Sequence, residues 1–113
     1  MVLVVLLFPA LALGETVKFD DLVITSGLYY KKFANIPFTG KVTGKQQGNF
    51  KHGKHHGPWV IHHHNGQLSS KGTYKDGKRV GPWFDYFKNG TVDEKYTGTF
   101  KDGNREGPWV SYR

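Results

Sequence analysis

Short segments rich in aromatic and β-branched residues run along most of the chain and are separated by glycine-containing turns. Segment 81–87, Gly-Pro-Trp-Phe-Asp-Tyr-Phe, is typical of them. Asn-Gly and Asp-Gly supply the positive φ angles of tight turns, and such pairs, with one His-Gly pair, begin at positions 52, 65, 76, 89 and 102. This spacing predicts an antiparallel meander. No helical periodicity follows segment 1–14, so the predicted fold class is all-β.

One sequence pattern occurs three times. It reads Gly-x-aromatic-Lys-x-Gly-x-x-x-Gly-Pro-Trp and begins at positions 48, 72 and 98. Its closing tryptophans, Trp59, Trp83 and Trp109, recur at nearly equal intervals along the chain. A repeat period in the range of roughly 20–50 residues predicts a stacked-repeat architecture. We expect repeats at 48–71, 72–97 and 98–113, the last of them incomplete.

Segment 15–47 is less regular than the rest. Segments 27–33 and 36–42 predict a degenerate hairpin unit that caps the stack, because an end repeat must shield its neighbours from water. The stretch 17–24 before it fits a short helix or a short strand equally well.

Alternation along the strands sorts the repeat residues onto two faces. Trp59, Trp83 and Trp109 share one face, while Tyr86 and Tyr112 share the other. The glycines of the repeat fit places where a ring lies across bare backbone. A lysine follows the aromatic residue of each copy and forms a row. We expect binding to involve the aromatic residues together with these lysines: Trp59, Trp83, Trp109, Tyr86, Tyr112, Lys51, Lys75 and Lys101. A second interpretation of the lysines is a solvated edge that prevents aggregation.

Segment 1–14 carries no charge and ends in small side chains at Ala10, Ala12 and Gly14. This pattern is typical of a secretory signal peptide, and it is shorter than the about 20 apolar residues that span a bilayer. We therefore expect segment 1–14 to direct export, with cleavage after Ala12 or Gly14, to a periplasmic or secreted location. The alternative is a buried N-terminal strand.

The chain is basic, with 16 Lys and Arg against 9 Asp and Glu, a formal net charge of +7. A basic surface favours anionic partners. Only three of the basic residues are Arg, the side chain that forks onto phosphates and bases, so we do not expect nucleic acid as a partner. The absence of Cys excludes disulfides, thiolate zinc sites and thiol catalysis.

Six histidines lie between positions 52 and 64. Imidazole clusters bind zinc, copper or nickel, and the candidate ligands are His55, His62 and His64. Against a metal site, His55 aligns with Arg79 and His62 with Tyr86, which favours simple drift of repeat positions. The carboxylates fall in turns, no serine lies in a nucleophile elbow and no Gly-Lys-Ser/Thr closes a phosphate loop. We expect neither a cofactor nor an enzymatic activity.

The repeat pattern and the Asn-Gly turn that follows it resemble those of MORN-repeat variant proteins. The resemblance covers roughly positions 20–113 and extends to the YwqK family of toxin–antitoxin system antitoxins. It implies an elongated, single twisted antiparallel sheet of hairpins without a cofactor, which binds a protein partner such as a toxin. For an exported chain, an immunity-type role fits best. The alternative function is an envelope-associated module that binds anionic lipid or cell-wall polymer.

Overall fold

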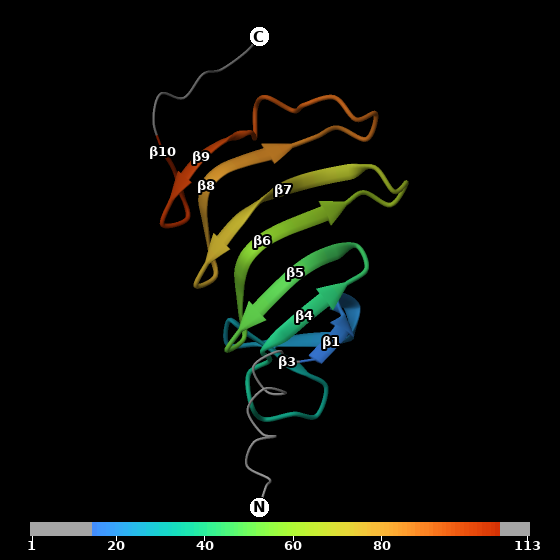
Figure 1. Cartoon of the computed structure of the whole chain (residues 1–113), viewed down its shortest axis with the longest axis vertical. Coiled ribbons are helices and arrows are strands. Elements are labelled where there is room, and N and C mark those ends of the chain that lie inside the picture. The colour runs from blue at the N-terminus through green and yellow to red at the C-terminus, as the bar shows by residue number, and fades with distance from the viewer. Residues whose placement is uncertain (1–14, 107–113) are drawn as a thin grey trace, which may run out of the picture.

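The computed structural model describes residues 15–106. A short 3-10 helix, Phe19–Asp21, separates the first two strands (Figure 1). The strands are β1 (Glu15–Lys18), β2 (Leu22–Thr25), β3 (Leu28–Lys31), β4 (Gly40–Thr43), β5 (Gln46–Lys51), β6 (Lys54–His62), β7 (Leu68–Lys75), β8 (Lys78–Asp85), β9 (Gly98–Lys101) and β10 (Asn104–Glu106). The all-β prediction is therefore confirmed for this part of the chain.

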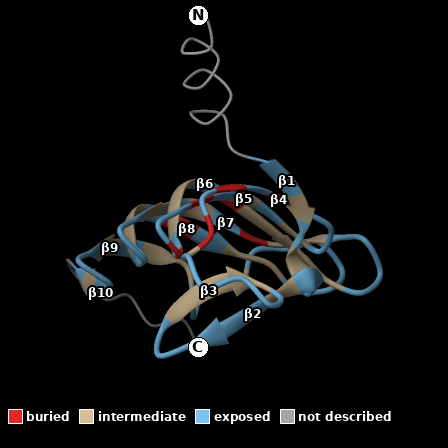
Figure 2. Cartoon of the chain, turned by 90° about the horizontal axis from the view of Figure 1, so that it is seen from below, coloured by how far each residue is buried: buried red, intermediate tan, exposed pale blue. Residues whose placement is uncertain are grey.

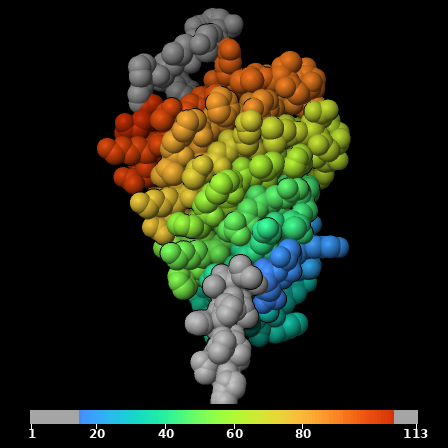
Figure 3. Space-filling model, in the orientation of Figure 1, coloured from blue at the N-terminus to red at the C-terminus, as the bar shows by residue number. Residues whose placement is uncertain are grey.

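Eight strands form one sheet in the order β1-β4-β5-β6-β7-β8-β9-β10. From β4 onward, neighbours along the sheet are neighbours along the chain and pair antiparallel, as the meander prediction requires. The surface consequently carries successive bands of sequence from one end of the sheet to the other (Figure 3). One pair differs, because β1 lies parallel to β4.

The hairpin predicted from segments 27–33 and 36–42 is wrong. Strand β3 pairs antiparallel with β2, not with β4, and the two form a separate two-stranded sheet. Their turn is Ser26-Gly27, with φ angles of 51° and 81°. Positive φ at both central residues defines a type I′ hairpin turn, so Ser26 and Gly27 reverse the chain between β2 and β3.

Two kinds of turn connect the strands of the meander. Along one edge, Asp76-Gly77 has φ angles of 51° and 83°, and the pairs at 52–53 and 102–103 have the same conformation. Along the other edge the connections after β6 and β8 are longer. In the loop between β6 and β7, residues 63–67, the amide of Gly66 donates to the carbonyl of His63 at 3.0 Å. Gly66 is the one residue of this loop with a positive φ angle. We call the first edge, with its two-residue turns, the tight-turn edge.

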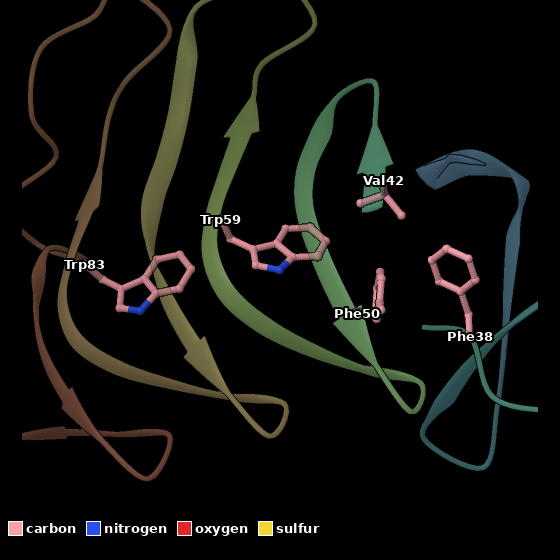
Figure 4. Close-up of a cluster of buried hydrophobic side chains, with 5 residues drawn as sticks. All are labelled: Phe38, Val42, Phe50, Trp59 and Trp83. Carbon is pink, nitrogen blue, oxygen red and sulfur yellow. The ribbon is translucent and has the colours of Figure 1, made fainter. Parts of the chain in front are cut away.

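The core lies on one face of the large sheet. Its buried side chains come from loop 32–39 and from strands β4, β5, β6 and β8 (Figure 4): Phe38, Val42, Phe50, Trp59 and Trp83. At the N-terminal end the 3-10 helix and the β2–β3 hairpin cover this face (Figure 2), and Phe19, Leu22 and Tyr29 pack against the core from there. We call the opposite side of the sheet the outer face. Within residues 15–106, no helix has the length and apolar character needed to cross a membrane.

Trp59 and Trp83 occupy matching environments. The indole nitrogen of Trp59 donates to the carbonyl of Asn49 at 3.1 Å, and that of Trp83 donates to the carbonyl of Thr73 at 2.9 Å. In both cases the acceptor lies ten positions earlier in the chain. Each ring also makes a perpendicular contact with the aromatic residue of the preceding strand, Phe50 for Trp59 and Tyr74 for Trp83.

Candidate functional site

Trp59 and Trp83 do not form a binding surface. Trp59 is 1% exposed and Trp83 0% exposed, so a partner cannot reach either ring, and their assignment to a binding face is wrong. The physical reason is that Gly48 and Gly72 lie beneath the two rings and let them sink onto the sheet. Tyr86 is half-buried. Trp109 and Tyr112 lie outside the described residues.

The lysines of the repeat are exposed on the outer face. In the β5–β6 hairpin, Phe50 pairs with His55 on the core side, and the next pair toward the turn is Lys51 with Lys54. Because side chains alternate, this second pair points away from the core. In the same way, Lys75 pairs with Lys78 next to the following turn. We define the lysine row as five exposed residues on adjacent strands: Lys51, Lys54, Lys75, Lys78 and Lys101.

The lysine row runs along the tight-turn edge across five consecutive strands, β5 to β9. Neighbouring strands lie about 4.8 Å apart, and within a hairpin the two lysines stand directly opposite each other. The aliphatic stem of Lys54 reaches the next turn, within 3.6 Å of where a Cβ on Gly77 would lie, and Lys78 stands in the same relation to Gly103. Lys54 and Lys78 were missed from sequence, although both follow a turn glycine in the same repeat position.

No carboxylate among residues 15–106 forms an ion pair with a member of the lysine row. The turn acids Asp76 and Asp102 lie at the same edge without closing such a pair. Two like charges directly opposite each other on antiparallel strands are destabilising, by about 0.2–1 kcal/mol. Lys51–Lys54 and Lys75–Lys78 are two such pairs. The row therefore carries a concentrated positive charge that no ion pair within residues 15–106 neutralises.

An apolar strip accompanies the lysine row on the outer face. On β8, Val80, Pro82 and Phe84 have the same parity as Lys78, and the last two are exposed. On β6, the exposed Pro58 and the half-buried Val60 occupy the places equivalent to Pro82 and Phe84. Phe84 is 38% exposed. Lys71 lies over its ring, 5.9 Å from the centroid. Cations and apolar carbon therefore alternate over this face.

No family model, curated protein or solved structure matches this chain.

His55 belongs to the core and not to a metal site. Its ring lies 4.5 Å from that of Trp59 and 4.5 Å from that of Tyr74, centroid to centroid, and it also contacts Phe50 and Tyr29. Burial lowers the pKa of His55 to about 4, so the ring is neutral at pH 7. Its ring is thus part of the aromatic packing, and within residues 15–106 it belongs to no group of metal-ligating side chains.

The predicted metal cluster is not assembled. His55 and His62 stand at opposite ends of β6, and the rise of a strand separates them by roughly 20 Å. His64 lies beyond the strand, where its Nδ1 is 3.4 Å from the Nζ of Lys45. No three metal-ligating side chains converge anywhere within residues 15–106. The prediction that His55, His62 and His64 bind one metal is therefore wrong.

Arg79 and Arg105 occupy, one and two hairpins further along the chain, the position that His55 has in the β5–β6 hairpin. Arg79 lies over the rings of Trp83 and Phe100, 4.1 and 5.4 Å from their centroids, and Arg105 lies 5.5 Å from the centroid of Phe100. Guanidinium groups stack well on aromatic faces. The sequence alignment of His55 with Arg79 thus marks one structural position, in which a planar nitrogen-containing group is inserted between rings.

Proposed function

We propose that this chain is a non-enzymatic protein-binding module built from MORN-like hairpin repeats, and that its outer face binds an acidic partner protein. The observation that carries the proposal is the lysine row, five exposed cations on adjacent strands without an ion-pair partner among residues 15–106. An acidic protein surface placed along the row would offset the repulsion between the lysines that stand opposite each other. Electrostatic complementarity of this kind raises the rate of association and selects the partner.

The apolar residues of the outer face favour a protein partner over a purely charged polymer. Pro58, Val60, Pro82 and Phe84 lie beside the row, and protein interfaces combine such an apolar centre with a charged rim. Lysine dominates the row, whereas readers of nucleic acid rely on arginine for forked contacts to bases. Nucleic acid is therefore not the partner we propose.

The MORN-like repeat assignment rests on the threefold sequence pattern and on the matching surroundings of Trp59 and Trp83. Resemblance to the YwqK family suggests the role. We propose an antitoxin-like or immunity-type protein whose partner is a toxin with an acidic surface. Export by segment 1–14 would place this encounter outside the cytoplasm, in the periplasm or beyond.

The decisive experiment reverses charge in the row and compares it with an equal reversal elsewhere. The test variant replaces Lys51, Lys75 and Lys101 by Glu, and the control replaces Lys18, Lys32 and Lys88, which are exposed but lie outside the row. A partner captured by the wild-type chain is purified, and its affinity is measured by calorimetry at two ionic strengths. We expect the test variant to bind at least tenfold more weakly, and wild-type affinity to fall as salt rises.

Equal affinity of the two variants for the purified partner would reject the row as the contact surface. A second arm measures sedimentation with vesicles that contain phosphatidylglycerol and with isolated cell-wall polymer. If the wild-type chain binds those and the row variant does not, while no protein binds stoichiometrically, the partner is an anionic envelope component and the protein-binding proposal is wrong.

A further inference from the structure

Two loops at the edge opposite the tight-turn edge contain an Asn-Gly pair (Figure 1). Asn65-Gly66 lies between β6 and β7, and Asn89-Gly90 lies between β8 and β9. An Asn-Gly pair can react within itself, because glycine has no side chain to hinder the approach of its backbone nitrogen to the amide carbon of the asparagine. All four residues are exposed, so water reaches both pairs.

The two loops have the same backbone hydrogen bonds. The amide of the glycine donates to the carbonyl three positions earlier, at 2.8 Å for Gly90 and at 3.0 Å for Gly66. The two glycines have nearly equal φ angles of 92° and 88°. In each loop the asparagine Oδ1 accepts a hydrogen bond from the amide two positions later, at 3.0 Å from Thr91 and at 2.9 Å from Gln67, which forms an Asx-turn. The backbone therefore gives neither pair an advantage.

The side-chain amides of the two asparagines have different partners. The Oδ1 of Asn89 also accepts a hydrogen bond from the hydroxyl of Thr91, at 2.7 Å. Gln67, at the equivalent place beside Asn65, has no hydroxyl. The Nδ2 of Asn65 instead donates to the carbonyl of Lys88 at 3.1 Å, whereas the Nδ2 of Asn89 has no hydrogen-bond partner among residues 15–106. Because a backbone N–H can only donate, the Asx-turns fix which side-chain atom is the oxygen.

We propose that Asn89 is a site of spontaneous deamidation and that the fold protects Asn65 from the same reaction. The backbone nitrogen of Gly90 gives its proton to solvent and attacks Cγ of Asn89. The bond between Cγ and Nδ2 breaks, Nδ2 takes up a proton and leaves as ammonia, and a cyclic succinimide remains. Water then opens the ring to aspartate or isoaspartate. Each event creates a carboxylate, so the formal net charge of +7 falls by one.

The hydrogen bonds account for the difference in rate. Negative charge develops on the Oδ1 of Asn89 during the attack, and two donors of Thr91, its amide and its hydroxyl, are already in place to stabilise it. At Asn65 only the backbone amide of Gln67 does so. The side chain of Asn65 must also break its hydrogen bond to Lys88 before its nitrogen can leave, and Asn89 has no such bond to lose.

The fold also accommodates the product at one position only. A carboxylate at position 89 keeps both donors of Thr91, and hydrogen bonds to a charged acceptor are stronger than those to a neutral one. A carboxylate at position 65 would place an oxygen against the carbonyl of Lys88, so that two acceptors face each other without a donor. The lysine row lies at the opposite edge of the sheet, so this proposal does not depend on the proposed function.

Incubation of the full-length chain in mildly alkaline buffer tests the proposal. Peptide mapping by mass spectrometry follows deamidation of both pairs in the folded chain and in the same chain unfolded in guanidinium chloride. We expect similar rates in the unfolded chain, because glycine follows both asparagines. In the folded chain Asn89 should react about fivefold faster than Asn65 or more, the effect of one hydrogen bond. Thr91→Val removes the hydroxyl, keeps the backbone donor and should lower this ratio.

Equal rates of the two pairs in the folded chain would overturn the proposal. So would a Thr91→Val chain with an unchanged ratio, or a folded chain in which neither pair reacts while the unfolded chain is consumed. Two further variants test how the fold accommodates the product. Asn65→Asp should shift the midpoint of urea denaturation to lower urea, and Asn89→Asp should not. The reverse order would contradict the protection of Asn65.

Discussion

The indole ring of Trp83 lies directly on the backbone of Gly72, a glycine of the neighbouring strand β7. A Cβ atom on Gly72 would fall 2.2 Å from a ring carbon of Trp83. Trp59 and Gly48 repeat this relationship one hairpin earlier, with a distance of 2.6 Å. A bare backbone is thus the surface on which each indole packs, and the cross-strand glycine determines that the ring is buried.

The first prediction concerns Gly72→Ala. The added methyl group cannot be accommodated unless the ring or the strand moves, and overpacking of this kind lowers the free energy of unfolding by about 1–3 kcal/mol. Urea denaturation of the variant and the wild-type chain measures the difference. The effect should disappear in a Trp83→Ala background, because the two substitutions are coupled through the same contact.

Gly48→Ala gives an independent copy of this prediction, because its Cβ would lie 2.6 Å from the ring of Trp59. We expect a loss of similar size, which should again disappear when Trp59 is replaced by Ala. A loss that persists without the indole would show that glycine is needed there for backbone freedom and not for the ring contact.

The second prediction compares adjacent aromatic residues on opposite faces of β8. Trp83→Ala removes a ring that is 0% exposed, and truncation of a buried Trp lowers the free energy of unfolding by about 3–5 kcal/mol. Phe84→Ala removes a ring on the outer face, together with its contact to Lys71, and should lower it by about 1 kcal/mol or less. Thermal and chemical denaturation measure both. If Phe84→Ala proves the more damaging, the assignment of the core to the Trp83 face is wrong.

The meander could be predicted because its determinants are local. Asp76-Gly77 and the pairs like it encode positive φ at the turn itself, and such a turn pairs the two strands that it joins. Strand β1, by contrast, pairs with β4 although the whole β2–β3 hairpin and loop 32–39 lie between them in the chain, and no pattern near Val17 indicates that partner. Ser26-Gly27 forms the same turn as Asp76-Gly77, but Ser-Gly carries a weaker sequence signal for it than Asp-Gly.

The candidate site was only half predictable for a related reason. Alternation places Trp59 and Trp83 on one face, but it does not say which face is buried. That information lies in the partner strand, where Gly48 and Gly72 lie beneath the rings. The lysines of the binding surface were found from the repeat, whereas Lys54 became part of the row only through its register with Lys51.

The third prediction concerns the pH dependence of stability through His55. Burial lowers its pKa to about 4 in the folded chain, from an ordinary value of 6.5. Between these values the unfolded chain binds a proton that the folded chain does not. The free energy of unfolding contributed by the neutral ring is therefore complete above pH 6.5, decreases as the pH falls from 6.5 to about 4, and is constant below. Titration of the His55 ring by NMR should give a midpoint below pH 5.

Two variants isolate this contribution from that of other groups. The difference in unfolding free energy between wild type and His55→Gln should shrink as the pH is lowered from 6.5 to about 4. His64→Gln, which removes an exposed imidazole beyond the end of β6, should not reproduce the effect of His55→Gln. A His55 ring that titrates near pH 6.5 would contradict its placement among the aromatic rings.

The fourth prediction is that the lysine row lowers the stability of the fold that carries it. Lys75 stands directly opposite Lys78, so Lys75→Glu exchanges a repulsive cross-strand pair for an attractive one. We expect the free energy of unfolding to rise by about 0.2–1 kcal/mol at low ionic strength and the gain to shrink in high salt. Lys71→Glu is the control, because it removes a cation from the ring of Phe84 and should give no gain. A less stable Lys75→Glu chain would mean that the row is neutralised within the monomer. A chain that becomes more stable while it loses its partner would instead show that the repulsion is kept for binding.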